Sequence, residues 1–365
     1  MEESGKKVCI VGAGLSGLVC GMRLAKEGFD VDIVEELTYA GGLLASTRVG
    51  NEYIELLPHH LRKTDKSLLA LVKEEGMLDN VGWYDSLWYG RASRKKLGYF
   101  TGGFAGLINI LIQDITDHGG RISYSTTVNE ISRRETENGV KYVTSCIMNN
   151  SGKIDIVSDF VIFTGSCRTF VNVSHGLPIS INFRDQLMNI TYKASISIMM
   201  LLKRKPSDVY LQKLPEGMPF NRIVNHTNCF GQRSYGGNII YLVGTCSISD
   251  PLWIASDEEI MDNYLKAFRK LYPLIRKQDI KSWRLTKIRY AVSEKYPEQD
   301  LTNPLEGLYI CASGLVDSAS SAAPENRMDK VISLAGDICR RVLDSVRETE
   351  STSVVTPINE NEMIL

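Results

Sequence analysis

Three glycines near the N-terminus have the spacing of a dinucleotide-binding turn: Gly12, Gly14 and Gly17. In such a turn Gly12 lets the chain reverse sharply, and Gly14 lets the backbone approach a pyrophosphate group. Gly17 allows the next helix to pack closely on the preceding strand. The N-terminus of that helix offers N–H groups and a partial positive charge to phosphate oxygens. The spacing therefore predicts a nucleotide site at the end of the first strand.

The elements on either side of the turn agree with this prediction. Residues 7–11 have the pattern of a buried strand, residues 15–27 that of a helix which Gly28 ends, and residues 31–35 that of a second strand. Glu35 ends the second strand, where a carboxylate can accept hydrogen bonds from ribose hydroxyls. A strand, a glycine turn, a helix, a strand and an acid in this order favour a dinucleotide.

A second glycine pair, Gly41-Gly42, follows the acid and precedes Leu43 and Leu44. With this pair the sequence resembles the FAD-binding fingerprint of the amine oxidase, protoporphyrinogen oxidase and phytoene desaturase superfamily. There the pair lets the chain pass close to the phosphates and the flavin. Many members have an arginine after the pair, whereas this sequence has Leu43. The resemblance implies that the dinucleotide is FAD.

Further segments extend the resemblance to about residue 346. Leu57-Pro58-His59-His60 is similar to the histidine-containing segment under the flavin in this group and in UDP-galactopyranose mutases. Residues 96–104 are similar to the group's GY-x-x-GGF segment. The blocks at 225–228, 250–253 and 324–327 resemble uncharacterised FAD-dependent oxidoreductases of the group.

The glycine turn and the resemblance together predict a set of residues around the cofactor. Val128 is expected where the family's backbone pairs with adenine, and Gly314 with Asp317 stand for a Gly-Asp pair that the family often has near the cofactor. The predicted cofactor residues are Gly12, Ala13, Gly14, Leu15, Ser16, Gly17, Glu35, Glu36, Gly41, Gly42, Leu43, Leu44, Pro58, Val128, Thr164, Gly165, Gly314, Asp317, Arg327 and Met328.

Four side chains are candidates for catalysis beside a flavin. His59 and His60 either exchange a proton with the substrate, since an imidazole titrates near neutral pH, or brace the loop under the ring. His226, in a strand-like stretch, either faces the substrate pocket or is a structural histidine. Arg289 either reaches the flavin edge, where a cation would stabilise an anionic reduced flavin, or lies on a solvated strand face.

The segment between Tyr89 and Leu97 departs from the family's pattern. Relatives carry a large helical insertion there that covers the active site, whereas this chain passes almost directly from one block to the next. We expect a more exposed flavin, a larger substrate or a cover supplied by a partner.

Composition excludes several other classes of function. The 365 residues hold 42 Lys and Arg against 43 Asp and Glu, a net charge of −1, so no basic excess suggests a nucleic-acid partner. No stretch approaches the roughly 20 apolar residues of a membrane span, and the short polar N-terminus leaves no room for a signal peptide. The eight cysteines stand singly, which argues against a metal site or a redox dithiol and favours a reducing, cytoplasmic location.

The fold class expected from this order is α/β: a Rossmann-like FAD-binding domain with an interleaved β-rich substrate domain. Helices are predicted at 66–75, 104–118, 257–271 and 329–346, and strands at 194–203, 222–225, 238–247 and 283–292. The predicted FAD-binding domain comprises 1–60, 101–170 and 300–347, the substrate domain 61–100 and 171–299, and a flexible tail 348–365.

The leading hypothesis is an FAD-dependent oxidoreductase that oxidises a small-to-medium organic substrate by hydride transfer to the flavin. One alternative is a non-redox isomerase similar to UDP-galactopyranose mutase, which uses reduced flavin. Another is a flavin-binding subunit without catalysis. The sequence points to the cofactor and not to a particular substrate.

Overall fold

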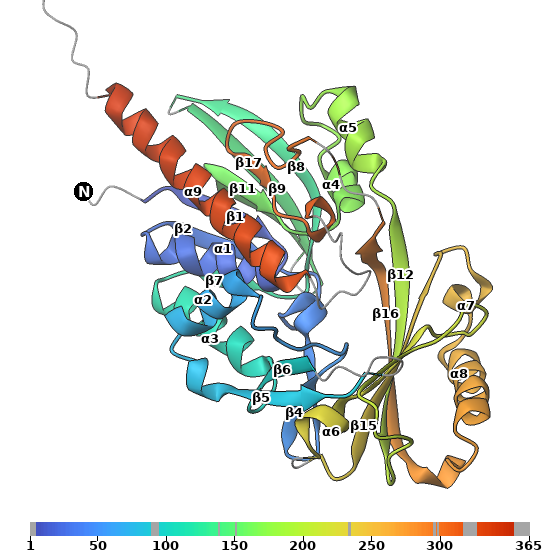
Figure 1. Cartoon of the computed structure of the whole chain (residues 1–365). Coiled ribbons are helices and arrows are strands. Elements are labelled where there is room, and N and C mark those ends of the chain that lie inside the picture. The colour runs from blue at the N-terminus through green and yellow to red at the C-terminus, as the bar shows by residue number, and fades with distance from the viewer. Residues whose placement is uncertain are drawn as a thin grey trace, which may run out of the picture.

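A five-stranded parallel sheet forms the centre of one half of the molecule (Figure 1). The computed structural model describes residues 5–88, 95–137, 139–149, 152–232, 235–294, 297, 299–316 and 327–353. The sheet has the order β17-β11-β1-β2-β7, and each neighbouring pair runs parallel. Its strands are β1 (Lys7–Val11), β2 (Asp30–Val34), β7 (Arg121–Ser123), β11 (Phe160–Phe163) and β17 (Leu308–Ile310).

The central strands are continuous apolar runs because both faces of this sheet are covered. Val8 and Ile10 pack in one core with the helices α1 (Leu15–Lys26), α3 (Ala105–Asp117) and α9 (Met328–Ser353). Cys9 and Val11 point to the other side. There they pack in a second core with the antiparallel sheet β8 (Thr126–Thr136), β9 (Gly139–Met148) and β10 (Gly152–Ser158).

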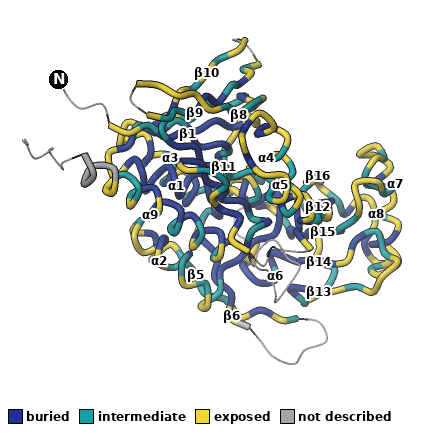
Figure 2. The backbone as a smooth tube through the Cα atoms, turned by 90° about the horizontal axis from the view of Figure 1, so that it is seen from above, coloured by how far each residue is buried: buried dark blue, intermediate teal, exposed yellow. Residues whose placement is uncertain are grey.

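A second five-stranded sheet, antiparallel in every pairing, forms the other half of the molecule. Its order is β13-β14-β15-β12-β16, with the bounds β12 (Tyr192–Leu202), β13 (Leu211–Lys213), β14 (Arg222–Asn225), β15 (Asn238–Cys246) and β16 (Ile280–Ser293). Ile196 and Ile198 of β12 pack against α8 (Asp257–Leu271) in a third core. The outer surface of α8 is exposed (Figure 2).

Shorter elements connect these layers. Two small sheets of two antiparallel strands are formed by β3 (Ser46–Val49) with β4 (Glu52–Glu55), and by β5 (Val81–Ser86) with β6 (Lys95–Phe100). The short helices are α2 (Lys66–Glu74), α4 (Cys167–Val173), α5 (Ile181–Met188), α6 (His226–Phe230) and α7 (Pro251–Ile254), with single 3-10 turns at Gly42–Leu44, Leu78–Asn80, Lys277–Asp279 and Ser313–Leu315.

Several predicted elements differ from the structure in their bounds or type. The second strand ends at Val34, so Glu35 is the first residue after it. His226 begins helix α6 and does not lie in a strand, because the chain turns into a helix directly after β14. Helix α9 continues to Ser353, beyond the predicted end at residue 346. Residues 89–94, where the family's insertion is missing, lie outside the described residues.

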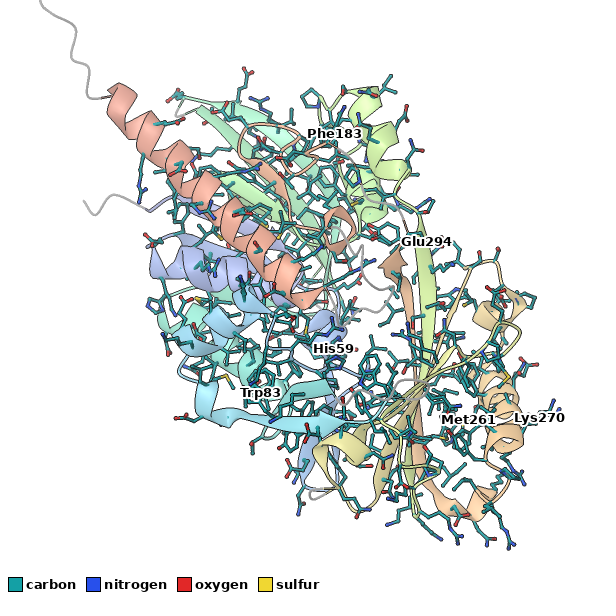
Figure 3. All side chains as sticks on the ribbon, in the orientation of Figure 1. His59, Trp83, Phe183, Met261, Lys270 and Glu294 are labelled. Carbon is teal, nitrogen blue, oxygen red and sulfur yellow. The ribbon has the colours of Figure 1, made fainter. Side chains whose placement is uncertain are left out.

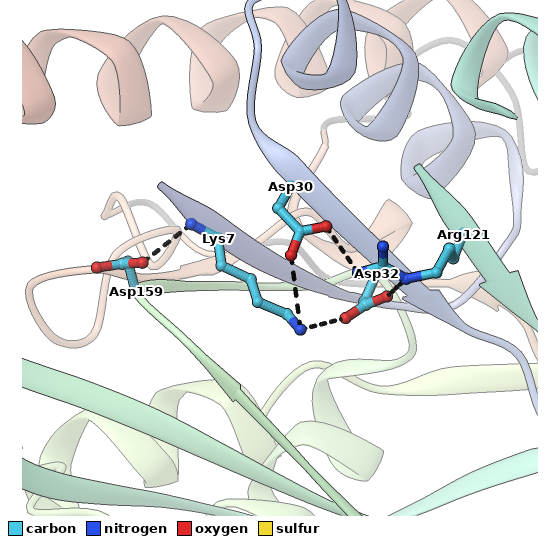
Figure 4. Close-up of polar contacts among 5 residues, drawn as sticks. All are labelled: Lys7, Asp30, Asp32, Arg121 and Asp159. Carbon is cyan, nitrogen blue, oxygen red and sulfur yellow. Dashed lines mark hydrogen bonds and ion pairs between the residues drawn. The ribbon is translucent and has the colours of Figure 1, made fainter. Parts of the chain in front are cut away.

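An ion-pair network joins the strands of the parallel sheet at one edge (Figure 4). The Lys7 ammonium lies 2.7 Å from the Asp32 carboxylate, and the Arg121 guanidinium donates to Asp30 at 2.6 Å and to Asp32 at 2.8 Å. Burial opposes the ionisation of Asp32, but the hydrogen bonds from Arg121 and Lys7 outweigh it and lower the pKa of this carboxyl. The network therefore holds β1, β2 and β7 in register most firmly while Asp32 is ionised.

Candidate functional site: a cavity between two sheets

The first glycine turn leaves no space for side chains at two of its positions. Gly12 has a φ of 104°, and a Cβ there would lie 2.5 Å from the Thr164 hydroxyl. A Cβ at Gly17 would lie 1.9 Å from the carbonyl oxygen of Gly12. Both positions therefore require glycine to bring β1, α1 and the end of β11 together.

The second glycine turn is hydrogen-bonded to the first. The Gly41 N–H donates to the Ala13 carbonyl at 2.9 Å, and Gly41 has a φ of 111°. A Cβ on Gly42 would come within 3.1 Å of the Gly14 Cα, so the two backbones are nearly in contact. Gly14 is the N-cap of α1 and provides no side-chain acceptor. The first-turn N–H groups of α1 therefore receive no side-chain hydrogen bond from the N-cap.

Glu35 is fixed beside the first turn by backbone hydrogen bonds. One carboxylate oxygen accepts from the Ala13 N–H at 2.7 Å, and the other accepts from the Leu37 N–H at 2.9 Å. The side chain is 7% exposed, and burial raises its pKa although both hydrogen bonds favour the charged form. Each oxygen keeps a second lone pair for a ligand hydroxyl.

A cavity of about 670 Å³ begins at these turns and ends against the second sheet. Its volume lies within the range of small-molecule sites. The predicted site residues that line it are Gly12, Gly14, Glu35, Glu36, Gly42, Leu43, Val128, Thr164, Gly165 and Arg289. Leu56, Leu57, Thr126, Tyr192, Ile288 and Tyr290 also line it. The cavity thus has walls from the parallel sheet, from the segment after β4, and from β12 and β16.

Other predicted cofactor residues are not among the described residues that line the cavity. Ala13, Leu15, Ser16 and Leu44 are buried, and Ala13 orients Glu35. A Cβ on Gly314 would lie 2.2 Å from the Tyr192 hydroxyl, so this glycine makes room for Tyr192. The other predicted cofactor residues outside the lining are Gly17, Gly41, Pro58, Arg327 and Met328. Arg327 is buried and donates to the Ser293 carbonyl at 2.7 Å. Asp317 lies outside the described residues.

The three candidate histidines are buried, and no histidine is among the described residues that line the cavity. His59, 1% exposed, lies in the interior of the molecule (Figure 3). Its Nδ1 is 2.9 Å from the Leu57 carbonyl, which can only accept, so this nitrogen carries a proton. His60 Nδ1 is 3.1 Å from the Tyr210 hydroxyl. The His226 ring centroid lies 4.7 Å from that of Tyr99.

Arg289 lines the cavity from β16, in the sheet opposite the one that precedes Glu35. It is exposed, and its guanidinium carbon is 5.7 Å from the centroid of the Tyr290 ring. Tyr290 in turn packs edge-on against Tyr192, with centroids 5.4 Å apart. The Tyr192 hydroxyl accepts from the Cys167 N–H at 3.2 Å. The antiparallel sheet therefore presents two aromatic rings and a cation to the cavity.

The sequence did not single out two important groups. Tyr192 begins β12 two residues before the predicted strand, and nothing local marks it as a wall residue. Glu55 is fully buried and accepts hydrogen bonds from the Tyr99 hydroxyl and the Phe104 N–H, both at 2.7 Å. An acid between the apolar residues Ile54 and Leu56 was the only available signal for it.

The sequence of this chain matches two protein-family models and short stretches of curated proteins. Residues 10–74 match the model of an NAD(P)-binding Rossmann-like domain, and residues 82–315 match the model of flavin-containing amine oxidoreductases. A 53-residue stretch is 40% identical to 1-hydroxycarotenoid 3,4-desaturase of Flavobacterium sp. (strain P99-3), covering 14% of this chain and 11% of that protein. Across three curated relatives, the chain matches at most 49% of a relative's length.

Two solved structures share the fold over almost the whole chain. One is assigned as a protoporphyrinogen oxidase from Exiguobacterium sp. 255-15, with a TM-score of 0.74 and 12% identity over 93% of this chain and 99% of that one. The other is a putrescine oxidase redesigned in its cofactor binding, with a TM-score of 0.65 and 11% identity over 93% and 99%.

Within the described part of the chain, no helix is both long and apolar enough to cross a membrane. The match over residues 82–315 covers well over half of the sequence and includes β12, β15, β16 and much of the cavity wall. This chain belongs to the family of flavin-containing amine oxidoreductases.

Proposed function

We propose that this chain binds FAD and oxidises a small-to-medium organic substrate by hydride transfer to the flavin. The observation that carries the proposal is the single cavity that runs from Glu35 and the glycine turns to Tyr192 and β16. The family match supports a flavin. Subsites for a nucleoside, at Glu35 and Val128, support FAD over the shorter FMN, which has no adenosine.

The two glycine turns fit a pyrophosphate. At Gly14 the nearest atom to an added Cβ is the Gly42 Cα at 3.9 Å, so the cavity side of this residue is open. The first-turn N–H groups of α1 have no side-chain cap and carry the positive end of the helix dipole. We assign these donors to the phosphates, and we assign Glu35 to the hydroxyls of the adenosine ribose.

When bound, a flavin supplies the acceptor for a hydride from a substrate carbon. The residues of this chain would orient the substrate and keep water away from it. An apolar wall suits the orientation of the substrate and the exclusion of water. It is formed by Leu43, Leu56, Leu57 and Ile288. The substrate would lose a hydride and a proton, and an external electron acceptor would have to take up the two electrons to complete a cycle.

We assign His59 and His60 to bracing this wall and not to proton transfer. The Nδ1–H of His59 donates to the Leu57 carbonyl and so fixes a residue that lines the cavity. Both imidazoles are almost fully buried, His59 at 1% and His60 at 3% exposure. The histidines would then act on the shape of the site. Their substitution should alter substrate affinity without creating a new pH dependence of flavin reduction.

The proposal is tested on the purified protein without knowledge of the substrate. The flavin is released by heat and identified by chromatography, and the apoprotein is titrated with FAD and FMN by fluorescence. We expect FAD to be released and to bind at least tenfold more tightly than FMN. A protein that neither contains nor binds FAD would refute the proposal. Turnover that requires pre-reduced flavin and transfers no net electrons would favour the isomerase alternative.

A further inference from the structure

Charge is distributed unevenly along the cavity. Among the described residues that line it, the four charged side chains are Glu35, Glu36, Lys287 and Arg289. The two acids follow β2, at the end assigned above to the adenosine, and the two cations lie on β16 of the other sheet. The acids therefore come from the parallel-sheet side of the cavity and the cations from the antiparallel-sheet side.

The two cations differ in how far they are already paired. The Lys287 ammonium donates to the Ala255 carbonyl at 2.9 Å, lies 3.8 Å from Asp257 and sits 5.9 Å from the Trp253 ring. Its charge is largely directed toward α7 and α8. For Arg289, the described residues place no carboxylate within ion-pairing distance, and the guanidinium lies near the Tyr290 ring. Arg289 is thus the cation with donors left for a ligand.

The pairing of β12 with β16 is irregular at Arg289. Along β12 and β16, Ser195 pairs with Ile288 but Lys193 pairs with Val292, so the register shifts across a bulge. Arg289 and Tyr290 lie inside this bulge, and both line the cavity. A bulge re-aims side chains that a regular strand would send to alternating faces, and bulges are common beside active sites.

We propose that the substrate carries a carboxylate, and that Arg289 binds this group at the β16 end of the cavity beside Tyr290 and Tyr192. The inference rests on the proposed FAD-dependent oxidation and names its substrate class. A planar guanidinium matches a carboxylate through two parallel hydrogen bonds, and stacking near an aromatic ring orients it beforehand. A substrate whose only charge is a protonated amine would be repelled by Arg289. The site is thus built for an organic acid, which includes an amino acid.

The test uses two probes that share one ring and differ in charge. FAD-loaded protein is titrated with benzoate and with benzylamine, and binding is followed as a change in the visible flavin spectrum. We expect benzoate to bind at least tenfold more tightly than benzylamine. In Arg289→Gln the benzoate affinity falls by about tenfold or more, and Arg289→Lys recovers part of the loss. The matched control is Arg269→Gln, which removes the same charge from an exposed position on α8 and leaves benzoate affinity unchanged.

The flavin spectrum recorded before each titration separates this inference from the proposed function. If no FAD is bound, the proposed function fails before a probe is added. If FAD is bound but benzylamine binds more tightly, or neither probe binds, or Arg289→Gln leaves benzoate affinity unchanged, the carboxylate assignment is overturned. Loss of FAD itself from Arg289→Gln would assign the guanidinium to cofactor binding and would also overturn the carboxylate assignment.

Discussion

Gly14→Ala is the sharpest test of the cofactor site, because the folded chain tolerates the new methyl group and a bound pyrophosphate would not. Gly14 has φ −72° and ψ 177°, which any residue adopts. The nearest protein atom to its Cβ would be the Gly42 Cα at 3.9 Å, an ordinary contact. Alanine is somewhat poorer than glycine at an N-cap, so folding should cost about 1 kcal/mol or less. A methyl group there would lie between the α1 donors and the phosphates.

The expected loss of FAD affinity follows from the hydrogen bonds that the methyl group displaces. A hydrogen bond to a charged group contributes about 1.5–3 kcal/mol. Losing one such bond would weaken FAD binding by roughly 10- to 100-fold. The assay titrates FAD into apoprotein by fluorescence, with urea unfolding of the same samples to show that the fold is intact. The matched control is Gly106→Ala on α3, where the Cβ would meet only the Met77 methyl carbon at 3.4 Å. Equal FAD affinity in Gly14→Ala and the unsubstituted protein would refute the assigned role of this turn.

Three further outcomes follow from the structure. Because the folded pKa of Asp32 is lowered, its contribution to stability is present above its ordinary value of 3.8 and is lost as the pH falls through the folded value. Urea unfolding from about pH 6 down to pH 3 should show this loss, and Arg121→Gln should flatten it. Glu35→Gln puts an amide NH₂ against a backbone N–H and should weaken FAD binding about tenfold, measured by the same titration; unchanged affinity would exclude the ribose assignment. Gly314→Ala places a Cβ 2.2 Å from the Tyr192 hydroxyl and should destabilise the fold by about 1–3 kcal/mol. Tyr192→Phe should relieve part of that cost in urea unfolding, and an equal cost in both backgrounds would show that the clash is elsewhere.

The parts that sequence predicted well depend on neighbours a few residues apart. The turn at Gly12–Gly17 is encoded by glycine spacing between an apolar strand and an apolar-periodic helix, and the strand and helix are where they were predicted. Helix α8 begins at its predicted residue because Ser256 and Glu259 form a capping box, with bonds of 3.2 and 3.0 Å. Such local patterns specify their geometry almost independently of the rest of the chain.

The parts that sequence did not predict depend on contacts between distant segments. Glu55 is held by Tyr99 and Phe104, which follow it by 44 and 49 residues, and no local pattern announces that pairing. The bulge in which Arg289 lies depends on how β16 pairs with β12, about 100 residues earlier in the chain. His226 begins a helix because the chain turns after β14, and its residue type does not reveal this.

Backbone groups line the cavity at the glycine turns, whereas side chains line it at β16. This difference affects which ligands the protein can bind. At the end proposed for the cofactor the wall is largely backbone, and the positions at Gly12 and Gly17 admit no side chain. On the β16 side the cavity is lined by Tyr192, Tyr290 and Arg289, which lie on two paired strands. A few substitutions there could change the substrate class without disturbing the glycine turns. If the proposal above holds, Arg289 selects an acid in a family that takes its name from amines, and the benzoate and benzylamine titrations decide between these two substrate classes.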